Sequence, residues 1–265
     1  MIRDPKTRLV AAPALPDRIV QHALLTEIGP PYESGFIDQS FACCTGRGPH
    51  RALLAHLAWA RRFRYRLCLD VRRYFASIHH ETLTGLFAER LRDPQTLALI
   101  RAFLRAGGAV YRSPQAAEVF GLAADPLPPG CGLPLGSYLS HWSGALYLDG
   151  LDHYVKRTLR VKGYLRYMDD LAFFGDDRAE LEDVREQVRT WLLRERGLEL
   201  KPRRDAVQPT TQPTTCLGFR ISRAGLLPGP KAKRRLKRLL EHGDELGHDR
   251  LVRSLVSYRG LLLSI

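Results

Sequence analysis

The chain lacks any apolar run long enough to cross a membrane. None of its 265 residues lies in a stretch that approaches the roughly 20 consecutive apolar positions that a transmembrane helix needs. The opening residues, Met1 to Pro5, also lack the pattern of a secretory signal peptide. We therefore expect a globular protein without a membrane partner, and a cytoplasmic location.

Cysteine is sparse and has no recognisable pattern. The chain has five: Cys43, Cys44, Cys68, Cys131 and Cys216. The number is odd and no metal-binding spacing occurs, so neither a disulfide framework nor a zinc site is indicated. Cys68 and Cys216 lie in apolar, β-like runs and read as small core residues. A reduced, cytosolic setting fits this pattern best.

Acidic residues are also few relative to basic ones. The chain has 28 Asp and Glu against 41 Lys and Arg, a net charge of +13. Such an excess favours a polyanionic partner, most often nucleic acid. General solubility is the alternative, but the charge is clustered: residues 201–240 hold 11 basic residues and one acid. The length and the 45% hydrophobic content allow a good core in one or two subdomains.

Two adjacent carboxylates stand out against this basic background. Asp169 and Asp170 lie between the β-prone runs 161–166 and 171–174, which predicts a hairpin with the acids at its tip. Asp is a common turn residue, so an ordinary hairpin turn is the alternative. A strand over 66–71 ends in a third acid, Asp70. Together, these three acids would suit two Mg²⁺ ions that clamp the oxygens of a phosphoryl transfer.

Four segments carry a family resemblance. They are Asp70-Val-Arg-Arg-Tyr-Phe-Ala-Ser-Ile, Gly132-Leu-Pro-Leu-Gly136-Ser-Tyr-Leu-Ser-His, Tyr167-Met-Asp-Asp170 and Leu217-Gly218-Phe219. In this order they resemble motifs A, B, C and E of reverse transcriptases, and the match runs from about residue 4 to about residue 262.

The resemblance implies an α+β fold. It would be a right-hand polymerase palm, an antiparallel sheet with helices on one face and the other left to nucleic acid, with small fingers and a short helical thumb. Residues 1–222 would form fingers and palm, and residues 223–265 an abbreviated basic thumb. Asp70, Asp169 and Asp170 would be catalytic, and with Val71 they would hold two Mg²⁺ ions, for which Mn²⁺ can substitute.

The resemblance also implies a nucleotide site. Arg8 would contact the triphosphate, because a guanidinium can bind phosphate through two hydrogen bonds. Phe75 would act as a sugar gate that admits deoxyribose. Gly136 would let the main chain approach the nucleotide. Arg204, or its neighbour Arg203, would stabilise the leaving pyrophosphate. A solvated terminus, a core aromatic ring and an ordinary glycine turn are the alternatives for Arg8, Phe75 and Gly136.

The nucleic acid would be held by a second set of residues. Arg47 would touch a backbone phosphate, with a plain structural loop as the alternative, and Leu217 and Gly218 would belong to the primer grip. A basic helix over 231–242 would lie along a duplex backbone. Its cations are Lys231, Lys233, Arg234, Arg235, Lys237 and Arg238.

Motif B departs from the common family pattern. Leu135 stands where most reverse transcriptases have Gln, and Ser140-His141 replaces Ser-Pro. An aliphatic residue there resembles the reverse transcriptases of diversity-generating retroelements, although His141 departs from that subgroup as well. The resemblance to that subgroup implies a small basic accessory protein and a template-repeat RNA.

Hydrophobic periodicity and capping residues predict the remaining elements. Asp17 should cap a first helix that Pro30-Pro31 ends, Gly197 should cap the C-terminus of a helix over 178–196, and Ser137 should cap the N-terminus of a long helix. Residues 109–131 should form a hairpin or loop, and 216–221 one strand. The expected helices span 17–28, 51–63, 81–92, 94–105, 137–159, 178–196 and 231–242.

The expected function is RNA-directed DNA polymerisation, with an RNA template, a DNA or RNA primer and deoxynucleoside triphosphates as partners. Three alternatives stay open: a defence-type relative that extends DNA without a template, a non-catalytic palm that binds RNA, and a nucleotidyl cyclase. Retention of all three acids argues against the second. The third has no reason to keep motif B and a basic thumb helix.

Overall fold

The computed structural model describes residues 2–3, 7–8, 10–121, 127–202, 205–241 and 252–256. For residues 2–3, 7–8 and 120 only the backbone is described. The helices are α1 (Leu15–Glu33), α2 (Pro49–Arg62), α3 (Tyr74–Ser77), α4 (His80–Ala88), α5 (Pro94–Gly108), the 3-10 helix η1 (Ala109–Arg112), α6 (Pro114–Phe120), α7 (Tyr138–Tyr147), α8 (Asp149–His153), the π-helix η2 (Tyr154–Thr158), α9 (Arg178–Arg196) and α10 (Pro230–Glu241).

The strands form three antiparallel sheets. A four-stranded sheet has the order β4-β5-β3-β6, a three-stranded sheet the order β7-β8-β9, and β1 pairs with β2. The strands are β1 (Ile2–Arg3), β2 (Thr7–Arg8), β3 (Tyr65–Asp70), β4 (Gly163–Tyr167), β5 (Asp170–Gly175), β6 (Gln208–Pro209), β7 (Thr214–Cys216), β8 (Phe219–Ser222) and β9 (Gly225–Pro228). The α+β class expected from the sequence is confirmed.

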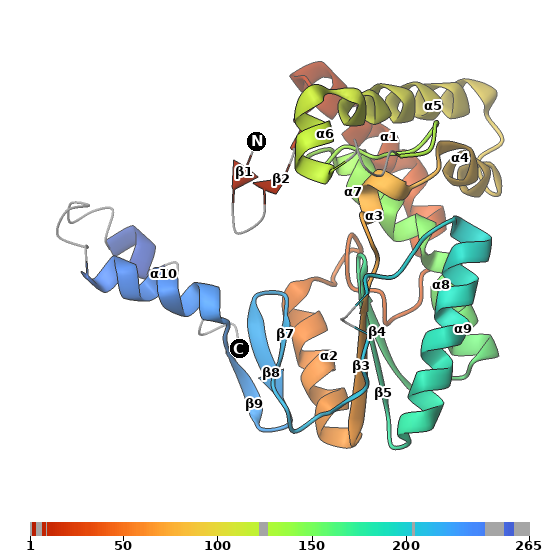
Figure 1. The fold of residues 1–265 in the computed structure, drawn as a ribbon. Helices are drawn as coiled ribbons and strands as arrows, with labels where there is room; N and C mark the ends of the chain where they lie inside the picture. Colours follow the sequence, from red (N-terminus) through yellow and green to blue (C-terminus); the bar gives the residue numbers. More distant parts are fainter. Residues whose placement is uncertain are drawn as a thin grey trace.

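Helices cover both faces of the four-stranded sheet, which corrects the expectation of one helical face. Leu67 and Phe173 point toward α9 and join the main core. On the opposite face, Leu165 and Phe174 pack against Ala60 and neighbouring side chains of α2. Figure 1 shows α2 and α9 on opposite sides of these strands. The alternation of a strand sends successive side chains to opposite faces, so both faces of β3 and β5 are apolar here. Helices α1, α4 and α5 gather beyond one end of these strands (Figure 1).

Helix α1 continues through its two prolines, which corrects the expected end at Pro30. It runs to Glu33, and its N-cap is Ala14 rather than Asp17, which lies in the first turn. The Tyr32 hydroxyl donates to the carbonyl of Phe87, and the Tyr32 ring meets the Trp142 ring edge-on at 5.7 Å. Tertiary packing therefore holds the last turn in helical form although prolines remove main-chain donors there.

Residues expected as loop or hairpin are partly helical. Within 109–131, the described residues form η1 and α6, and Ser113 caps α6 by accepting a hydrogen bond from the Ala116 amide at 3.2 Å. Ser-Pro at a helix start is a signal that the sequence reading missed. The long helix expected from 137 is divided into α7, α8 and η2, with Leu148 outside helical geometry. Ser137 caps α7 as expected.

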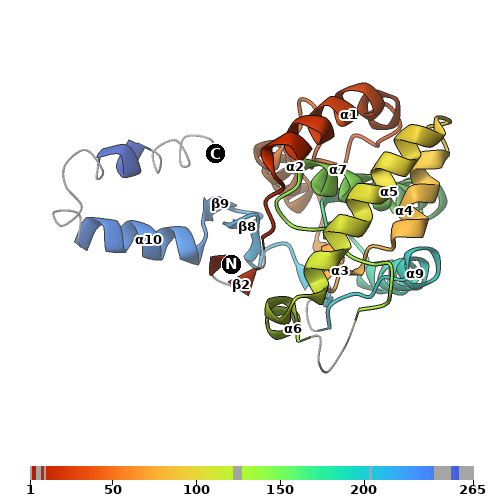
Figure 2. The same ribbon diagram turned by 90° about the horizontal axis from the view of Figure 1, so that it is seen from above.

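The stretch 216–221 is a hairpin, not a single strand. Leu217 and Gly218 have φ of 48° and 84° and connect β7 to β8, with Cys216 paired to Phe219. Two consecutive residues with positive φ match the tight turn that the twist of a hairpin favours. Leucine rarely adopts positive φ, which explains why the sequence predicted a continuous strand through Leu217 and Gly218. Helix α10 follows β9 and projects away from the palm (Figures 1 and 2).

Candidate active site

Two carboxylates face each other at the end of the central strand pair. Asp70 is the last residue of β3 and Asp170 the first of β5, and their Cα atoms are direct partners in the antiparallel register. Directly opposite residues in such a pair have Cβ atoms about 5 Å apart. The Asp70 residue is 9% exposed, whereas Asp170 is exposed. Like charges at this separation repel, so the pair favours a cation beside it.

The third carboxylate lies in the turn of the β4–β5 hairpin. Tyr167 pairs with Asp170, so Met168 and Asp169 form a two-residue connection. Met168 has φ of 55°, in the left-handed region that a side chain with a Cβ normally avoids. Backbone strain of this kind is concentrated at functional sites.

The Asp169 carboxyl resists ionisation in this position. Burial raises its pKa to about 6, and the negative charges of Asp170 and Asp70 add to the effect. Burial and the two neighbouring carboxylates thus both oppose the charge of Asp169, while the nearby Lys201 favours it. A bound divalent cation would reverse this balance and favour the ionised carboxylate.

Lys201 reaches the same site, and the sequence reading missed it. Its ammonium group donates to Asp70 Oδ1 at 2.5 Å, and its amide donates to the Asp70 carbonyl at 2.8 Å. The backbone places it there, because Leu200 bridges to Val71 and the Arg72 amide donates to the Glu199 carbonyl. The expectation of a cation in this stretch named Arg203 and Arg204, which lie outside the described residues. The alternation of apolar and charged residues from Leu198 to Lys201 was the sequence signal that could have indicated an extended segment here.

The residues present suit a divalent cation that substrate phosphates help to hold. Among the described residues, no three His, Cys, Asp or Glu side chains form a ready-made cage. Mg²⁺ usually binds through one or two carboxylates together with water and substrate phosphates, so no such cage is required. All of the donors are hard oxygen atoms, as Mg²⁺ prefers. Val71 is fully buried and apolar, so only its main-chain carbonyl could serve as a ligand.

Phe75 lies where motif A meets motif B. Its ring is 5.4 Å from the His141 ring, and the Leu133 amide donates to its carbonyl at 2.7 Å. A Cβ on Gly144 would lie 3.3 Å from its ring, so glycine permits this close approach. The side chain remains half-exposed, and the fold thus brings the proposed sugar gate against α7.

Gly136 is closely packed by the chain's own N-terminal segment. Its φ is 110°, and an added Cβ would lie 2.8 Å from Val10 Cγ1 and 2.9 Å from the Ala11 carbonyl oxygen. Leu135 bridges to Val10, and its carbonyl accepts from the Ala11 amide at 2.8 Å. This packing requires glycine at 136 whether or not a nucleotide approaches.

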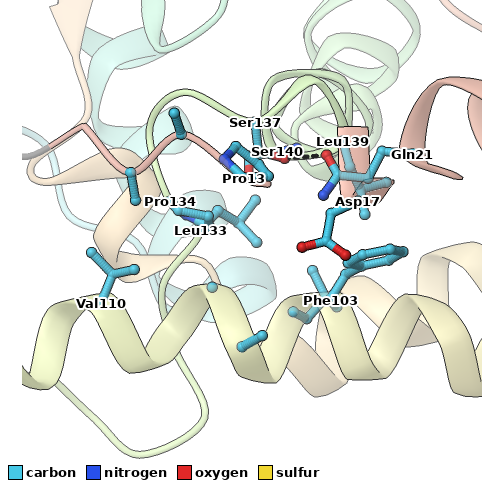
Figure 3. A pocket seen from close by; sticks show the side chains of 15 residues that line it. Pro13, Asp17, Gln21, Phe103, Val110, Leu133, Pro134, Ser137, Leu139 and Ser140 are labelled. Carbon is cyan, nitrogen blue, oxygen red and sulfur yellow. Dashed lines mark hydrogen bonds between the residues drawn. The ribbon is translucent and has the colours of Figure 1, made fainter. Parts of the chain in front are cut away.

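A cavity of about 220 Å³ lies behind this loop, between α1 and α5 (Figure 3). Phe103, Leu133 and Pro134 supply apolar walls, and Asp17 lies at its edge. The Ser137 hydroxyl donates to Gln21 Oε1 at 2.7 Å across one side. Leu133 and Pro134 of the motif-B loop therefore border this cavity together with Ala11, Ala12 and Pro13 of the N-terminal segment.

Arg47 is engaged by its own loop. Its guanidinium donates to the carbonyls of Ile37 and Ser40, the latter at 2.8 Å, and lies 3.4 Å from an Asp38 carboxylate oxygen. These bonds fit the structural alternative, and contact with a phosphate stays a prediction. The Arg8 side chain lies outside the described residues.

The basic residues of α10 all face solvent. Lys231, Lys233, Arg234, Arg235, Lys237 and Arg238 are exposed, whereas Leu239 is buried. Lys237 lies 3.5 Å from Glu241, a weak surface ion pair. At the preceding hairpin turn, Gly218 is exposed and Leu217 half-buried. The exposed positive charges of α10 therefore lie on the part of the molecule that projects away from the four-stranded sheet (Figure 1).

Comparison with known proteins gives a family match over most of the chain. Residues 3–221 match the family model for reverse transcriptase (RNA-dependent DNA polymerase). The curated protein YkfC of Escherichia coli (strain K12) is 25% identical over 255 residues, which covers 82% of this chain and 64% of that protein. The chain therefore spans less than two thirds of the length of that relative.

Two solved telomerase structures resemble this chain. A telomerase from Candida albicans in complex with a TWJ fragment of telomeric RNA is 12% identical, with a TM-score of 0.51 over 82% of this chain and 38% of that chain. An apo telomerase from Candida tropicalis, truncated from its C-terminal domain, is 11% identical with a TM-score of 0.47, over 80% of this chain and 45% of that chain. Within the part of this chain that the structure describes, no helix combines the length and apolarity needed to cross a membrane.

Proposed function

The chain belongs to the reverse transcriptase (RNA-dependent DNA polymerase) family, and we propose that it extends a primer along an RNA template by a two-metal transfer of nucleotides. The observation that carries this proposal is the direct pairing of Asp70 with Asp170, with Asp169 in the adjoining turn. Residues 1–222 would form fingers and palm, and residues 223–265 a short thumb.

Each carboxylate has a distinct position in this scheme. Asp70 and Asp169 would hold two Mg²⁺ ions, with Asp170 and the Val71 carbonyl beside them. When bound, the ions would activate the primer 3′-hydroxyl and stabilise the departing pyrophosphate. Lys201 neutralises Asp70 when no cation is present, and its ammonium could turn to the pyrophosphate once a cation takes Asp70.

The other residues would bind rather than react. Phe75 would close on C2′ of the incoming deoxynucleotide, and the N-terminal end of α7 beside Gly136 would favour its negative charge. The cations of α10 would follow a duplex backbone, with Leu217 and Gly218 against the primer. Leu135 favours a role in a diversity-generating retroelement, with a small basic accessory protein, whereas His141 departs from the pattern of that subgroup.

A primer-extension assay would test this function. We expect incorporation of deoxynucleotides on an RNA template with Mg²⁺, and none by Asp70→Asn or Asp169→Asn. Both variants should keep the wild-type circular dichroism spectrum, because each exchanges one oxygen for nitrogen at nearly constant volume. Asp176→Asn, at the opposite end of β5, is the matched control and should extend normally.

Three outcomes would count against this function or this site. Extension without any template would favour the template-independent relative. RNA binding without extension, in both Mg²⁺ and Mn²⁺, would favour the non-catalytic palm. Normal extension by Asp70→Asn would contradict the assignment of the site.

A further inference from the structure

A buried ion pair lies beneath the hairpin that carries Asp169. Arg166 in β4 and Asp152 in α8 are both fully buried. Arg166 Nη2 donates to Asp152 Oδ2 at 2.6 Å, and Arg166 Nε donates to Oδ1 at 2.8 Å. This geometry, in which a guanidinium donates two parallel hydrogen bonds to one carboxylate, is the strongest and most directional form of a salt bridge.

The pair is tied to several other segments. The Tyr164 hydroxyl donates to Asp152 Oδ1 at 2.7 Å, and Arg166 Nη2 lies 3.1 Å from both Ser40 Oγ and the Ala145 carbonyl. The main chain of Arg166 also exchanges hydrogen bonds with Gln39 and Phe41. Although burial opposes its charge, the Asp152 carboxylate raises the pKa of Arg166, so the guanidinium stays charged.

One guanidinium nitrogen points to the catalytic turn. Arg166 Nη1 donates to the Met168 carbonyl at 3.3 Å. Met168 is the residue with φ of 55°, and its carbonyl belongs to the peptide unit that enters Asp169. A donor that holds this carbonyl restrains the rotation of the peptide and therefore the direction of the Asp169 side chain.

Stability alone does not account for such a pair. Burying two charges costs about as much free energy as their attraction returns, and apolar residues of similar size often serve as well. The geometry instead resembles the outer hydrogen bonds that orient metal ligands in other proteins.

We propose that Arg166, held by Asp152, is a positioning residue that sets the Asp169 carboxylate for binding a divalent cation. The proposal rests on the proposed function, because it takes Asp169 as a metal ligand. A lysine at 166 would keep a positive charge near Asp152 but could not donate to Asp152 and to the Met168 carbonyl with the same planar group.

The test compares Arg166→Lys with Arg196→Lys. Arg196 is the matched control, since its guanidinium also donates to backbone carbonyls, those of Tyr147 and Glu195, and stacks on Trp191 without contacting the turn. Binding of Mn²⁺ to the nucleotide-free protein is measured from the electron paramagnetic resonance signal of free Mn²⁺. We expect about 10- to 100-fold weaker binding for Arg166→Lys and wild-type binding for Arg196→Lys.

Kinetics give a second measurement. In primer extension, Arg166→Lys should lower kcat by about 100-fold while the KM for deoxynucleotide changes little, because a displaced ligand impairs the reaction more than binding. If Arg166→Lys does not fold, Ser40→Ala replaces it. That variant removes one bond to Arg166, and it should weaken Mn²⁺ binding by about two- to tenfold.

The outcomes separate the two proposals. Wild-type Mn²⁺ binding by both Arg166→Lys and Ser40→Ala would overturn the positioning role, as would wild-type binding by Asp169→Asn. Equal losses of Mn²⁺ affinity in Arg166→Lys and Arg196→Lys would mean that the Arg166–Asp152 ion pair has only a structural role. Weakened Mn²⁺ binding in a protein that never extends a primer would support the positioning role and reject the polymerase function.

Discussion

Several side chains in this fold sit in environments that oppose their usual chemistry. Burial and the neighbouring negative charges raise the pKa of Asp169 to about 6, and Met168 adopts positive φ beside it. Phe75 packs against the edge of the core but keeps its ring half-exposed. Arrangements that cost stability are expected where chemistry takes place.

Replacement of Phe75 tests the sugar gate. Phe75→Ala should raise the use of ribonucleotides relative to deoxynucleotides by about tenfold or more, because the ring would no longer clash with a 2′-hydroxyl. The ratio of kcat/KM for the two sugars is the measurement. Phe103→Ala, which truncates a half-buried ring of α5, should leave the ratio unchanged. An unaltered ratio in Phe75→Ala would make Phe75 a packing residue only.

His56 is a second residue whose environment opposes its charge. It is fully buried, and neither ring nitrogen has a hydrogen-bond partner among the described residues. Burial lowers its pKa to about 3, and the nearby positive charge of Arg66 adds to the effect. The unfolded chain therefore binds a proton below about pH 6.5 that the folded protein does not, so stability falls as the pH decreases through this range.

We expect His56 alone to remove about 2 kcal/mol from the free energy of unfolding between pH 6.5 and pH 4.5. In His56→Leu this part of the pH dependence should disappear, as measured by urea denaturation at several pH values. His50→Leu on the exposed start of the same helix is the control and should retain the wild-type slope. A slope in His56→Leu as steep as in the wild type would show that other groups govern the acid sensitivity.

At the scale of elements, α10 differs from the other long helices. Its basic residues are exposed and gathered in one stretch, with Leu239 as its buried contact. The exposed arginines of α9 pair locally, Arg178 with Glu182 and Arg189 with Glu186, and on α10 Lys237 lies near Glu241. Helix α10 holds six cations and one acid, whereas α9 holds five of each, so the excess of positive charge lies on α10.

Charge reversal in these two helices should have different effects. Lys233→Glu, Arg234→Glu and Lys237→Glu together should weaken binding of an RNA–DNA duplex evenly across sequences. The slope of log affinity against log salt should flatten by up to about 2.7, from about 0.9 for each phosphate that a cation no longer neutralises.

The same number of reversals in α9 provides the matched control. Changing Arg178, Arg189 and Arg194 to Glu alters the net charge equally but should leave the slope near the wild-type value. Salt titrations monitored by fluorescence anisotropy measure both variants. Equal flattening in the two would mean that net charge, and not α10, governs binding.

At the scale of the whole molecule, the proposed function predicts that nucleic acid also stabilises the fold, because the net charge is +13. Charge of one sign destabilises a compact state through self-repulsion. A ligand that binds only the folded chain stabilises it by an amount that depends on its concentration relative to Kd.

An RNA–DNA duplex at 100 times its Kd should raise the free energy of unfolding by about 2.7 kcal/mol. Thermal unfolding at low salt measures this gain, and 1 M salt should abolish it, because screening then acts within about 3 Å. Polyglutamate at equal charge concentration controls for general charge neutralisation. Stabilisation by polyglutamate equal to that by the duplex would contradict specific binding.

Much of this site could be read from the sequence. The strand ending in Asp70, the hairpin around Asp169 and the helix 178–196 with its Gly197 cap follow from local alternation, turn and capping signals, and the structure has them where expected. Lys201 could not be predicted in the same way, since 131 residues separate it from Asp70. Local periodicity does not specify which distant side chains meet.

The sequence by itself determined the elements whose signals are local, the excess of positive charge, and the order of motifs by which the family is recognised. Only the tertiary structure decided that α2 covers the second face of the sheet, that Lys201 lies on Asp70, and that Arg166 joins Asp152 to the Met168 carbonyl. The physical reason is that a local pattern sets backbone conformation and the buried face of each element. The pairing of polar groups across the core depends on how those faces pack together.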